Sequence, residues 1–473
     1  MLRSTVSALL VSATLVAATA AQSPITFGNL VVVRAGDGAT SLSSAVAPVF
    51  LDEYTTAGTL VQSIALPTAP SGANRAFGGR GSGTSELYLN VSLDGRYLTL
   101  AGYDAVPGTP DPTSTLATTT ARVIARVDFI GVVDTSTALS NAYSGGNIRA
   151  AISDDGNNFW TSGTALTEGG IRYAAGLGAT TCMAISSGAP TNCRTIGAFD
   201  GQLYTSSASG THLGVSSVGV GMPTMSGAPV DALPGFPTSG GTTVESAYDY
   251  FFADPTTLYV ADDNTTAGDG GIQKWTFAGG TWSKQYTLKL NPTAGCRGLT
   301  GFVQDGVVTL WGTMNVNATG GNQTQLCTVV DTGPAAIVTS LVTSAASTAF
   351  RGVRYFGLPP TSQRITASCG TADIGVYGNA QIGTDVRTYV RNAVGIPLIG
   401  YGTIPLSVPF CGCTFTHDFL LLVGPAATHT LSLPNNPTLS GVLILVQGLD
   451  LLAPGGCPNL MFTLTDGYAF TLQ

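Results

Sequence analysis

The sequence predicts an all-β protein: a six-bladed β-propeller followed by a small C-terminal β-sandwich. Short runs of alternating apolar and polar residues, bounded by Gly, Asp, Asn and Pro, dominate the chain, and helical periodicity is nearly absent. Asp-Gly turns recur at 94, 155, 200 and 305, with Asp-Pro at 254, and an aromatic residue and a second hairpin follow each turn. Four-strand units with a period of about 50 residues are typical of a propeller.

The chain opens with a segment that has the pattern of a secretory signal peptide. Residues 1–22, "MLRSTVSALLVSATLVAATAAQ", place one Arg before a short apolar run that ends in small residues. A membrane anchor is the alternative, but Ser and Thr interrupt the run and it is short for a span. We therefore expect a secreted or cell-surface protein that does not span the membrane after signal cleavage.

The remaining chain is long enough for two domains. Of 473 residues only 10% are charged, and the formal net charge is −8. Because there is no basic stripe, nucleic acid is not an expected partner. Aliphatic and aromatic residues are abundant, so that a packed core can form.

The repeat defines the first domain, which we place at residues 23–358. Five complete units cover about residues 85–344, and the sixth is split between the two ends of the repeat. "AFRGVRYFGL" (349–358) supplies its first strand, "GNLVVVRAGDG" (28–38) the next, and "VFLDEYTTAGTLVQSIAL" (49–66) the outer hairpin. Joining both ends in one blade would close the ring and remove its open edges. A seventh blade hidden in residues 207–245 is the alternative count.

The second domain begins after a short linker at 359–363. Residues 364–473 contain seven or eight short strand patterns, among them "IGVYGNAQIG", "GVLILVQGLDLL" and "FTLTDGYAFTL". Short strands at this density predict a small β-sandwich.

All eight cysteines follow the signal segment, and an even count in an exported chain favours disulfides. We expect a bond between Cys182 and Cys193, which flank a short loop, and one between Cys296 and Cys327, which share a unit. The four cysteines of the tail allow three connectivities, of which the preferred one joins Cys369 to Cys411 and Cys413 to Cys457.

A ring of charged residues is the candidate binding site. When the first strand of each blade is aligned on its turn, one position carries Glu or Arg in every blade: Glu86, Arg149, Arg194, Glu245, Arg297 and Arg351. Glu245 fits within one residue, since Ser246 has the better offset. One interpretation is a structural circuit in which Glu or carbonyl groups satisfy partly buried Arg. The other is an anion site, because two Arg are in excess and guanidinium groups bind carboxylate, sulfate or phosphate in bidentate fashion.

The sequence contains no catalytic motif: the G-x-S-x-G, H-E-x-x-H and P-loop patterns are all missing, and only three His are present. "DDNTTAGDGG" brings together Asp262, Asp263 and Asp269, whose oxygens would suit Ca²⁺, although a polar loop that caps strand ends explains them equally. We therefore expect no cofactor, with Ca²⁺ as the ion to consider.

Several segments resemble a group of exported bacterial β-propeller proteins with no assigned activity. The resemblance rests on "GNLVVVRAGDG", "LDEYTTAGTLVQSIALP" and "AFRGVRY". The tail, with "CGCTFTHD", "VQGLDLLAPGGC" and "FTLTDG", resembles a C-terminal β domain that is common in exported bacterial proteins. The resemblance implies the fold and export, and it implies no reaction.

Two functions from different classes follow. The favoured one is a non-catalytic exported propeller for extracellular binding or surface structure, whose partner would be a glycan, an anionic ligand or a surface protein. The alternative is a channel-centred, metal-assisted hydrolase of the lactonase or phosphoesterase type. The fold cannot separate them, since propellers support both. Carboxylates converging on one point would favour the enzyme.

Overall fold

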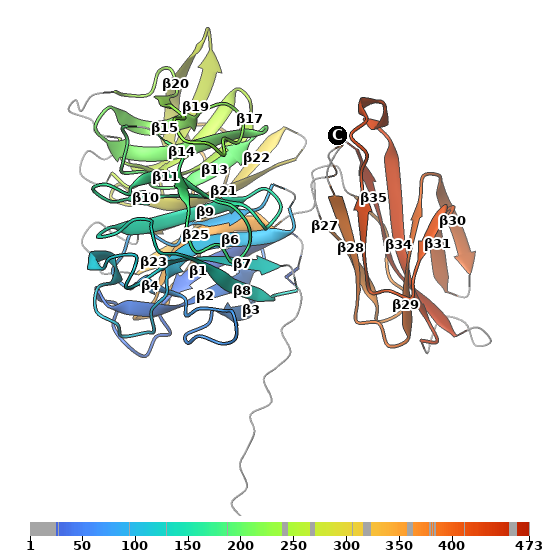
Figure 1. Cartoon of the computed structure of the whole chain (residues 1–473). Helices are drawn as coiled ribbons and strands as arrows, with labels where there is room; N and C mark the ends of the chain where they lie inside the picture. The colour runs from blue at the N-terminus through green and yellow to red at the C-terminus, as the bar shows by residue number, and fades with distance from the viewer. Residues whose placement is uncertain are drawn as a thin grey trace, which may run out of the picture.

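The structure is a computed structural model. It describes residues 25–472 except 27, 94, 129, 187, 239–244, 265–269, 305, 316–322, 357–362, 378–379, 381, 383–384, 411 and 454–460. Within this part the chain is all-β and built from antiparallel sheets. Figure 1 shows two β units, one from β1 (Asn29–Ala35) to β25 (Ala349–Phe356) and one from β26 (Gln363–Thr366) to β35 (Phe462–Thr471). In the described part no helix is long and apolar enough to cross a membrane.

Four sheets of the first unit have four strands each, taken in chain order. The first contains β9 (Asn147–Ser153), β10 (Phe159–Thr164), β11 (Gly170–Ala174) and β12 (Met183–Ala184). The second contains β13 (Ile196–Phe199), β14 (Gln202–Ser209), β15 (His212–Val218) and β16 (Val230–Ala232). The third contains β17 (Ala247–Asp254), β18 (Thr257–Asp262), β19 (Gly271–Ala278) and β20 (Thr281–Leu288). The fourth contains β21 (Cys296–Gln304), β22 (Val307–Asn315), β23 (Thr324–Val330) and β24 (Thr339–Thr343).

A nine-stranded sheet holds two further four-strand groups, which the short strand β4 (Gly78–Arg80) connects. One group is β5 (Leu89–Val91), β6 (Tyr97–Tyr103), β7 (Arg122–Asp128) and β8 (Val133–Leu139). The other is β25, β1, β2 (Val46–Tyr54) and β3 (Leu60–Ala65). The register places Leu30 opposite Tyr355 in β25 and opposite Tyr54 in β2. The predicted union of the two ends of the repeat in one group is thereby confirmed.

The turns between strands explain part of this regularity. Gly95, Gly156, Gly201 and Gly306 all have positive φ, a conformation that glycine adopts without steric cost. At the turn between β13 and β14 the preceding Asp200 is also at positive φ, 49°, as a type I′ hairpin requires.

The first strands of the six groups, here called the central strands, are β5, β9, β13, β17, β21 and β25. β5 contacts both β9 and β25, β9 contacts β13, and β21 contacts both β17 and β25. Buried apolar residues from several successive groups form one cluster, in which Ile152, Leu203, Tyr259 and Leu310 take part. This arrangement makes the first unit propeller-like, with a set of strands at its centre that are distant in sequence.

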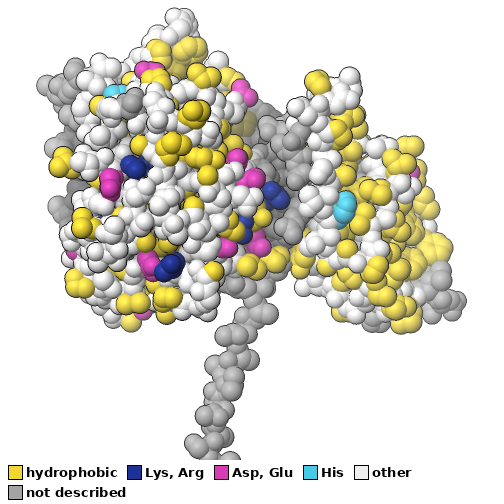
Figure 2. All heavy atoms as spheres, viewed as in Figure 1, with side chains coloured by type: hydrophobic (Ala, Val, Ile, Leu, Met, Phe, Trp, Pro, Cys, Tyr) yellow, Lys and Arg dark blue, Asp and Glu magenta, His cyan; other side chains and the backbone are white. Residues whose placement is uncertain are grey.

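The second unit consists of three sheets. The largest runs β26–β35–β34–β29–β32, where β29 is Ile396–Gly402, β32 is Leu421–Val423 and β34 is Leu443–Leu451. The others are β27 (Asp373–Tyr377), β28 (Asp385–Arg391) and β33 (Thr428–Ser432), and the pair β30 (Pro405–Phe410) and β31 (Cys413–His417). Residues of the five-stranded and three-stranded sheets, such as Ile399, Val446 and Val386, share one buried core. On the face in Figure 2 this unit displays mainly hydrophobic and uncharged side chains.

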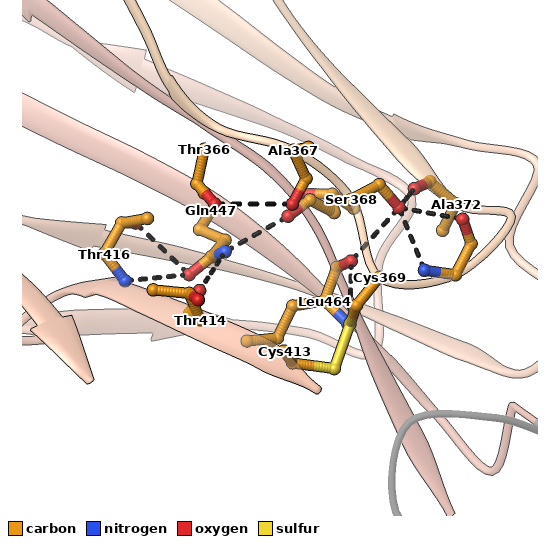
Figure 3. The surroundings of a disulfide bond; sticks show 12 residues. Thr366, Ala367, Ser368, Cys369, Ala372, Cys413, Thr414, Thr416, Gln447 and Leu464 are labelled. Atoms are coloured by element: carbon orange, nitrogen blue, oxygen red, sulfur yellow. Dashed lines mark hydrogen bonds between the residues drawn. A yellow bond between two sulfur atoms is a disulfide. The ribbon is translucent and has the colours of Figure 1, made fainter. Parts of the chain in front are cut away.

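The disulfide of the second unit differs from the preferred pairing. Cys369 is bonded to Cys413, with a Cα–Cα distance of 5.2 Å, and not to Cys411. Figure 3 shows how Cys369 is held beside Cys413 of β31. The backbone N–H of Cys369 donates to the carbonyl of Leu464 in β35, and the N–H of Leu464 donates to the Cys369 sulfur. Cys411 and Cys457 lie outside the described residues, so the second predicted bond stays a prediction.

The two disulfides predicted for the first unit are wrong, because Cys182, Cys193, Cys296 and Cys327 are all free thiols. Cys296 in β21 and Cys327 in β23 are separated by the intervening strand β22, and two strand spacings of about 4.8 Å exceed the reach of a disulfide. Cys182 precedes β12, the outermost strand of its sheet. Cys193 precedes β13, the central strand of the next sheet.

Candidate functional site

A buried ion pair joins the central strands at mid-length. Arg354 of β25 and Asp249 of β17 are paired in bidentate fashion, with Nη1–Oδ2 at 2.7 Å and Nη2–Oδ1 at 3.1 Å. Arg354 also donates to the carbonyl of Leu299 in β21 at 2.7 Å, and the backbone N–H of Leu299 donates to Asp249. Because Asp249 is fully buried, this pair depends on its geometry and on its additional hydrogen bonds.

Asn90 of β5 extends this network to the remaining central strands. Its side-chain oxygen accepts from Arg354 Nη2 at 2.9 Å, and its Nδ2 donates to the carbonyls of Ala151 in β9 and Ile196 in β13, at 2.9 and 2.8 Å. Asn90, Asp249 and Arg354, here called the central network, therefore touch all six central strands. The network divides the centre of the first unit into two ends with different chemistry.

The arginine end lies at the starts of the central strands, where Arg149, Arg194, Arg297 and Arg351 form what we call the arginine cluster. Tyr248 connects its members: the Arg194 Cζ is 3.8 Å and the Arg297 Cζ 5.7 Å from the centre of its ring. Tyr88 lies beside Tyr248, with ring centroids 6.3 Å apart. Burial lowers the pKa of Arg149, and the neighbouring charge of Arg194 lowers it further. Four guanidinium groups thus share one small region.

Most hydrogen bonds from the arginine cluster go to neutral acceptors. Arg149 Nη1 donates to Asn192 Oδ1 at 2.6 Å and to the carbonyl of Cys193 at 3.0 Å. Arg351 Nη2 donates to the carbonyl of Gly81 at 3.0 Å.

Arg194 and Arg297 are partly exposed, and they differ in their partners. Arg194 Nη1 donates to Ser246 Oγ and to the carbonyl of Ala247, whereas Arg297 Nε pairs with Asp263 at 2.9 Å. Because carbonyls and hydroxyls carry no full charge, the positive charge of the cluster is only partly neutralised.

Buried polar atoms without a partner mark the deep side of the arginine end. The Nε atoms of Arg149 and Arg351 and the hydroxyl of Tyr88 are buried, and they have no hydrogen-bond partner among the described residues. Arg351 is 4% exposed, and its burial, followed by the charge of Arg297, lowers its pKa to about 10. Buried donors are normally bonded, so a concentration of open ones indicates a place for a ligand or water.

Glu86 is the carboxylate next to these open donors. It is 2% exposed, and its burial raises its pKa above the ordinary value, although hydrogen bonds from Asn147, the Arg80 backbone and Tyr103 oppose that effect. The hydroxyl of Tyr103 donates to Oε1 at 3.1 Å, and Asn147 Nδ2 donates to the same oxygen. These bonds fix the orientation of the carboxyl group between β6 and β9.

The structure brings together five of the six residues of the predicted ring, and Glu245 is the one that it separates. The Glu245 carboxylate accepts from Lys284 Nζ at 2.8 Å and from Gln273 Nε2 at 2.5 Å, which directs it toward β20 and β19. Ser246 and Tyr248 contact the cluster instead. The alignment of this strand on its turn was ambiguous by one residue, and it selected Glu245. The alignment failed here because β17 contains a register shift after Ala247.

The candidate metal ligands do not form a cage in the described part of the chain, where no three His, Cys, Asp or Glu side chains gather to hold an ion. Asp262 is buried, its burial raises its pKa to about 7, and it accepts from the backbone N–H groups of Ser246 and Asn264. Asp263 pairs with Arg297, and Asp269 lies outside the described residues.

The aromatic end lies beyond the central network, at the far ends of the same strands. A cavity of about 280 Å³ opens there between Phe199, Tyr250, Phe252 and Tyr355, with Arg354 among its lining residues. Phe199 and Phe252 stack at 4.8 Å. Here the guanidinium group of Arg354 is already engaged by the central network, so that the cavity presents mainly apolar and aromatic surface.

Sequence reasoning missed the central network and Tyr88. Asn90, Asp249 and Arg354 each stand in an otherwise mainly apolar segment, "LYLNV", "AYDYFF" and "GVRYF". A polar residue in such a run is costly to bury without partners, and that is the signal that could have found them. Their partners belong to strands far apart in sequence, so the partners themselves could not be read from the pattern.

No protein-family model matches the chain, and no curated protein matches it. Solved structures similar to it include a protein of Bacteroides uniformis provisionally assigned as a 6-phosphogluconolactonase, at 10% identity and a TM-score of 0.38, over 85% of this chain and 100% of that one. A periplasmic gluconolactonase of Pseudomonas aeruginosa aligns at 14% identity and a TM-score of 0.38, over 86% and 100%. An exo-β-1,3-galactanase of Phanerochaete chrysosporium aligns at 10% identity and a TM-score of 0.33, over 82% and 97%.

These findings correct the favoured expectation of a non-catalytic binding or surface protein, because the similar solved structures include enzymes, and two of the three named here carry a lactonase assignment. The lactonase alternative is the one that agrees with them. At such low identity and TM-score the likeness concerns the fold alone, so support for a reaction has to come from the residues of this chain.

Proposed function

We propose that the chain is a hydrolase that acts on a small anionic ester, of the lactone type, at its arginine end. The observation that carries the proposal is the position of Glu86, a buried carboxyl with a raised pKa, beside Arg149 and Arg351, whose Nε atoms have no partner. A carboxylate base with a raised pKa and cationic donors in a region of low dielectric both assist ester hydrolysis.

In the proposed reaction Glu86 accepts a proton from a water molecule as the water oxygen attacks the carbonyl carbon of the ester. Arg149 and Arg351 stabilise the negative charge that develops on the carbonyl oxygen. The bond between the carbonyl carbon and the ring oxygen then breaks, and the proton held by Glu86 passes to the leaving oxygen. Tyr103 and Asn147 keep the carboxyl group oriented throughout.

The metal-assisted form of the hydrolase alternative is not needed for this reaction. The arginines supply the positive charge that a metal would otherwise provide. Ca²⁺ stays an ion to test at Asp262, Asp263 and Asp269. The oxygens of Asp262 already accept hydrogen bonds, and Asp263 pairs with Arg297.

Substitution of Glu86 by Gln tests this proposal. We expect the purified full chain to hydrolyse at least one member of a panel of neutral lactones, anionic lactones and nitrophenyl esters, and E86Q to lower kcat about 100-fold or more. E245Q is the matched control, because Glu245 is also buried yet points away from the cluster, and it should retain wild-type kcat. Full kcat in E86Q, or no turnover of the whole panel, would contradict the proposal.

We also propose the finer architecture on which this site depends: a six-bladed β-propeller over residues 23–358, a linker at 359–363 and a C-terminal β-sandwich over 364–473. The six four-strand groups and the contacts among the central strands support the propeller. The core shared by the five-stranded and three-stranded sheets supports the sandwich.

Export of the chain belongs to the same proposal. The signal pattern of residues 1–22 supports it, and so does the Cys369–Cys413 disulfide, since such bonds persist in oxidising compartments. The mature protein would then meet its substrate outside the cytoplasm, and the resemblance to exported bacterial proteins supports the same proposal.

A further inference from the structure

The arginine cluster contains two pairs that differ in depth. Arg149 and Arg351 are buried, at 8% and 4% exposure, and flank Tyr88 and Glu86. Arg194 and Arg297 are partly exposed, and both contact the Tyr248 ring. The deeper pair is sufficient for the chemistry proposed above, so the outer pair needs a separate explanation.

The outer pair retains donors for a ligand. The bonds of Arg194 run through Nη1 alone, to Ser246 and Ala247, and the Arg297 pair with Asp263 uses Nε. The Tyr248 ring helps to hold both guanidinium groups in place by cation–π contact. Arg side chains that are fixed in this way bind oxyanions with little further loss of side-chain freedom.

The charges of the arginine end do not cancel. Four guanidinium groups face the carboxylates of Glu86 and Asp263, while Asp249 is neutralised by Arg354 in the central network. Asp262, which accepts from the backbone N–H of Ser246, is a third carboxylate nearby, so the guanidinium groups still outnumber the carboxylates. Like charges held this close raise the free energy of the empty site, and a dianion would relieve more of the excess than a monoanion would.

We infer that the outer pair, Arg194 and Arg297, binds a phosphate monoester group of the ligand. Such a group carries between one and two negative charges at neutral pH and presents three acceptor oxygens, which suit guanidinium donors arriving from two strands. This inference rests on the proposed function for the placement of the rest of the substrate, whose ester would reach the deeper pair. The binding of the phosphate group alone does not depend on any reaction.

Calorimetric titration of the purified full chain at pH 8 tests the inference, with methyl phosphate as the probe and acetate as the monoanionic comparison. We expect methyl phosphate to bind at least tenfold more tightly than acetate. R194Q and R297Q should each weaken methyl phosphate binding about tenfold, while R194K should retain part of the affinity because it keeps the charge. R75Q is the matched control, since Arg75 is half exposed and pairs with Asp104 far along the chain from the cluster, and it should bind as the wild type does.

Thermal unfolding of each variant in the absence of ligand shows whether it is folded, so that loss of binding is interpretable. Equal affinity for acetate and methyl phosphate, or full affinity in the R194Q R297Q double variant, would overturn the inference. Methyl phosphate binding without hydrolysis of any ester would leave it intact and count against the proposed function alone. Hydrolysis of neutral lactones by a chain that binds no phosphate would do the reverse.

Discussion

The two ends of the central strands are built from the same six strands and have opposite chemistry. At the arginine end four cations gather around Tyr88 and Tyr248, and buried donors have no partner. At the aromatic end Phe199, Phe252 and Tyr355 line a cavity, and Arg354 is already fully engaged by Asp249 and Asn90.

This difference teaches that the charge of the open donors, and not the presence of a cavity, distinguishes the arginine end as the proposed site. The cavity at the aromatic end is mainly apolar, its one guanidinium group is bonded, and its open polar atom is the uncharged hydroxyl of Tyr250. At the arginine end the chain accepts the cost of burying Arg149 and Arg351 with open Nε atoms, and such a cost is typical of functional sites.

The largest expected effect concerns the central network, which separates the two ends. D249A should lower the free energy of unfolding by about 3–5 kcal/mol, because it leaves the Arg354 guanidinium buried without its counter-ion. Urea denaturation measures this. The double variant D249L R354M, which removes both charges, should recover most of the loss, and a D249A protein of wild-type stability would show that the pair does not hold the strands together.

The next prediction compares one substitution at the arginine end with one at the aromatic end, in stability and in sulfate binding. R351M should change the free energy of unfolding by less than about 1 kcal/mol. The reason is that burial and the charge of Arg297 already disfavour the Arg351 charge and lower its pKa to about 10. The same variant should weaken sulfate binding about tenfold. F252A should cost about 3 kcal/mol through the cavity that it creates and leave sulfate binding unchanged. Denaturation and calorimetry on both variants measure this, and the reverse pattern would exchange the roles of the two ends.

The smallest effect is the pH dependence of anion binding. Burial raises the pKa of Glu86, so its carboxyl group takes up a proton as the pH falls toward that raised value, and the arginine end becomes more positive. Sulfate keeps its two charges near and above this value, so its affinity should rise as the pH falls toward the raised pKa of Glu86.

The same shift has a consequence for stability. Between the ordinary pKa of a Glu, 4.5, and its raised value, the folded state binds more protons at Glu86 than the unfolded state does. The free energy of unfolding should therefore fall as the pH rises through this window, and E86Q should remove both this slope and the pH dependence of sulfate binding. An unchanged pH dependence in E86Q would assign it to another group, such as Asp262, whose pKa burial raises to about 7.

Much of the strand architecture could be predicted from the sequence, because hairpins are local. The turn at Asp200–Gly201 and the alternating segments around it set their own pairing, and "AFRGVRY" and "GNLVVV" could be joined because each lacked a partner in its own part of the chain. Cysteine pairing could not be predicted in the same way. Cys411 and Cys413 are two residues apart in the sequence, which is the repeat of a β-strand, so the pattern does not separate them. Only the register of β31 against its neighbours places Cys413 next to Cys369.

The site was predictable only in part, for a related reason. The arginines could be found because they occupy equivalent positions in successive units. The identity of the residue at β17 depended on a local register shift, which moved Glu245 out of the cluster and Tyr248 into it. The open donors on Tyr88 and Arg149 are a property of packing in three dimensions, which no sequence pattern records.

The most direct test of the central claim is a crystal structure of the full chain grown with tungstate, a tetrahedral dianion that anomalous scattering locates without ambiguity. The account predicts an anomalous peak at the arginine end, with tungstate oxygens within hydrogen-bond distance of at least two members of the arginine cluster. A peak in the cavity between Phe199 and Phe252, or an arginine end that stays empty at saturating tungstate, would contradict it.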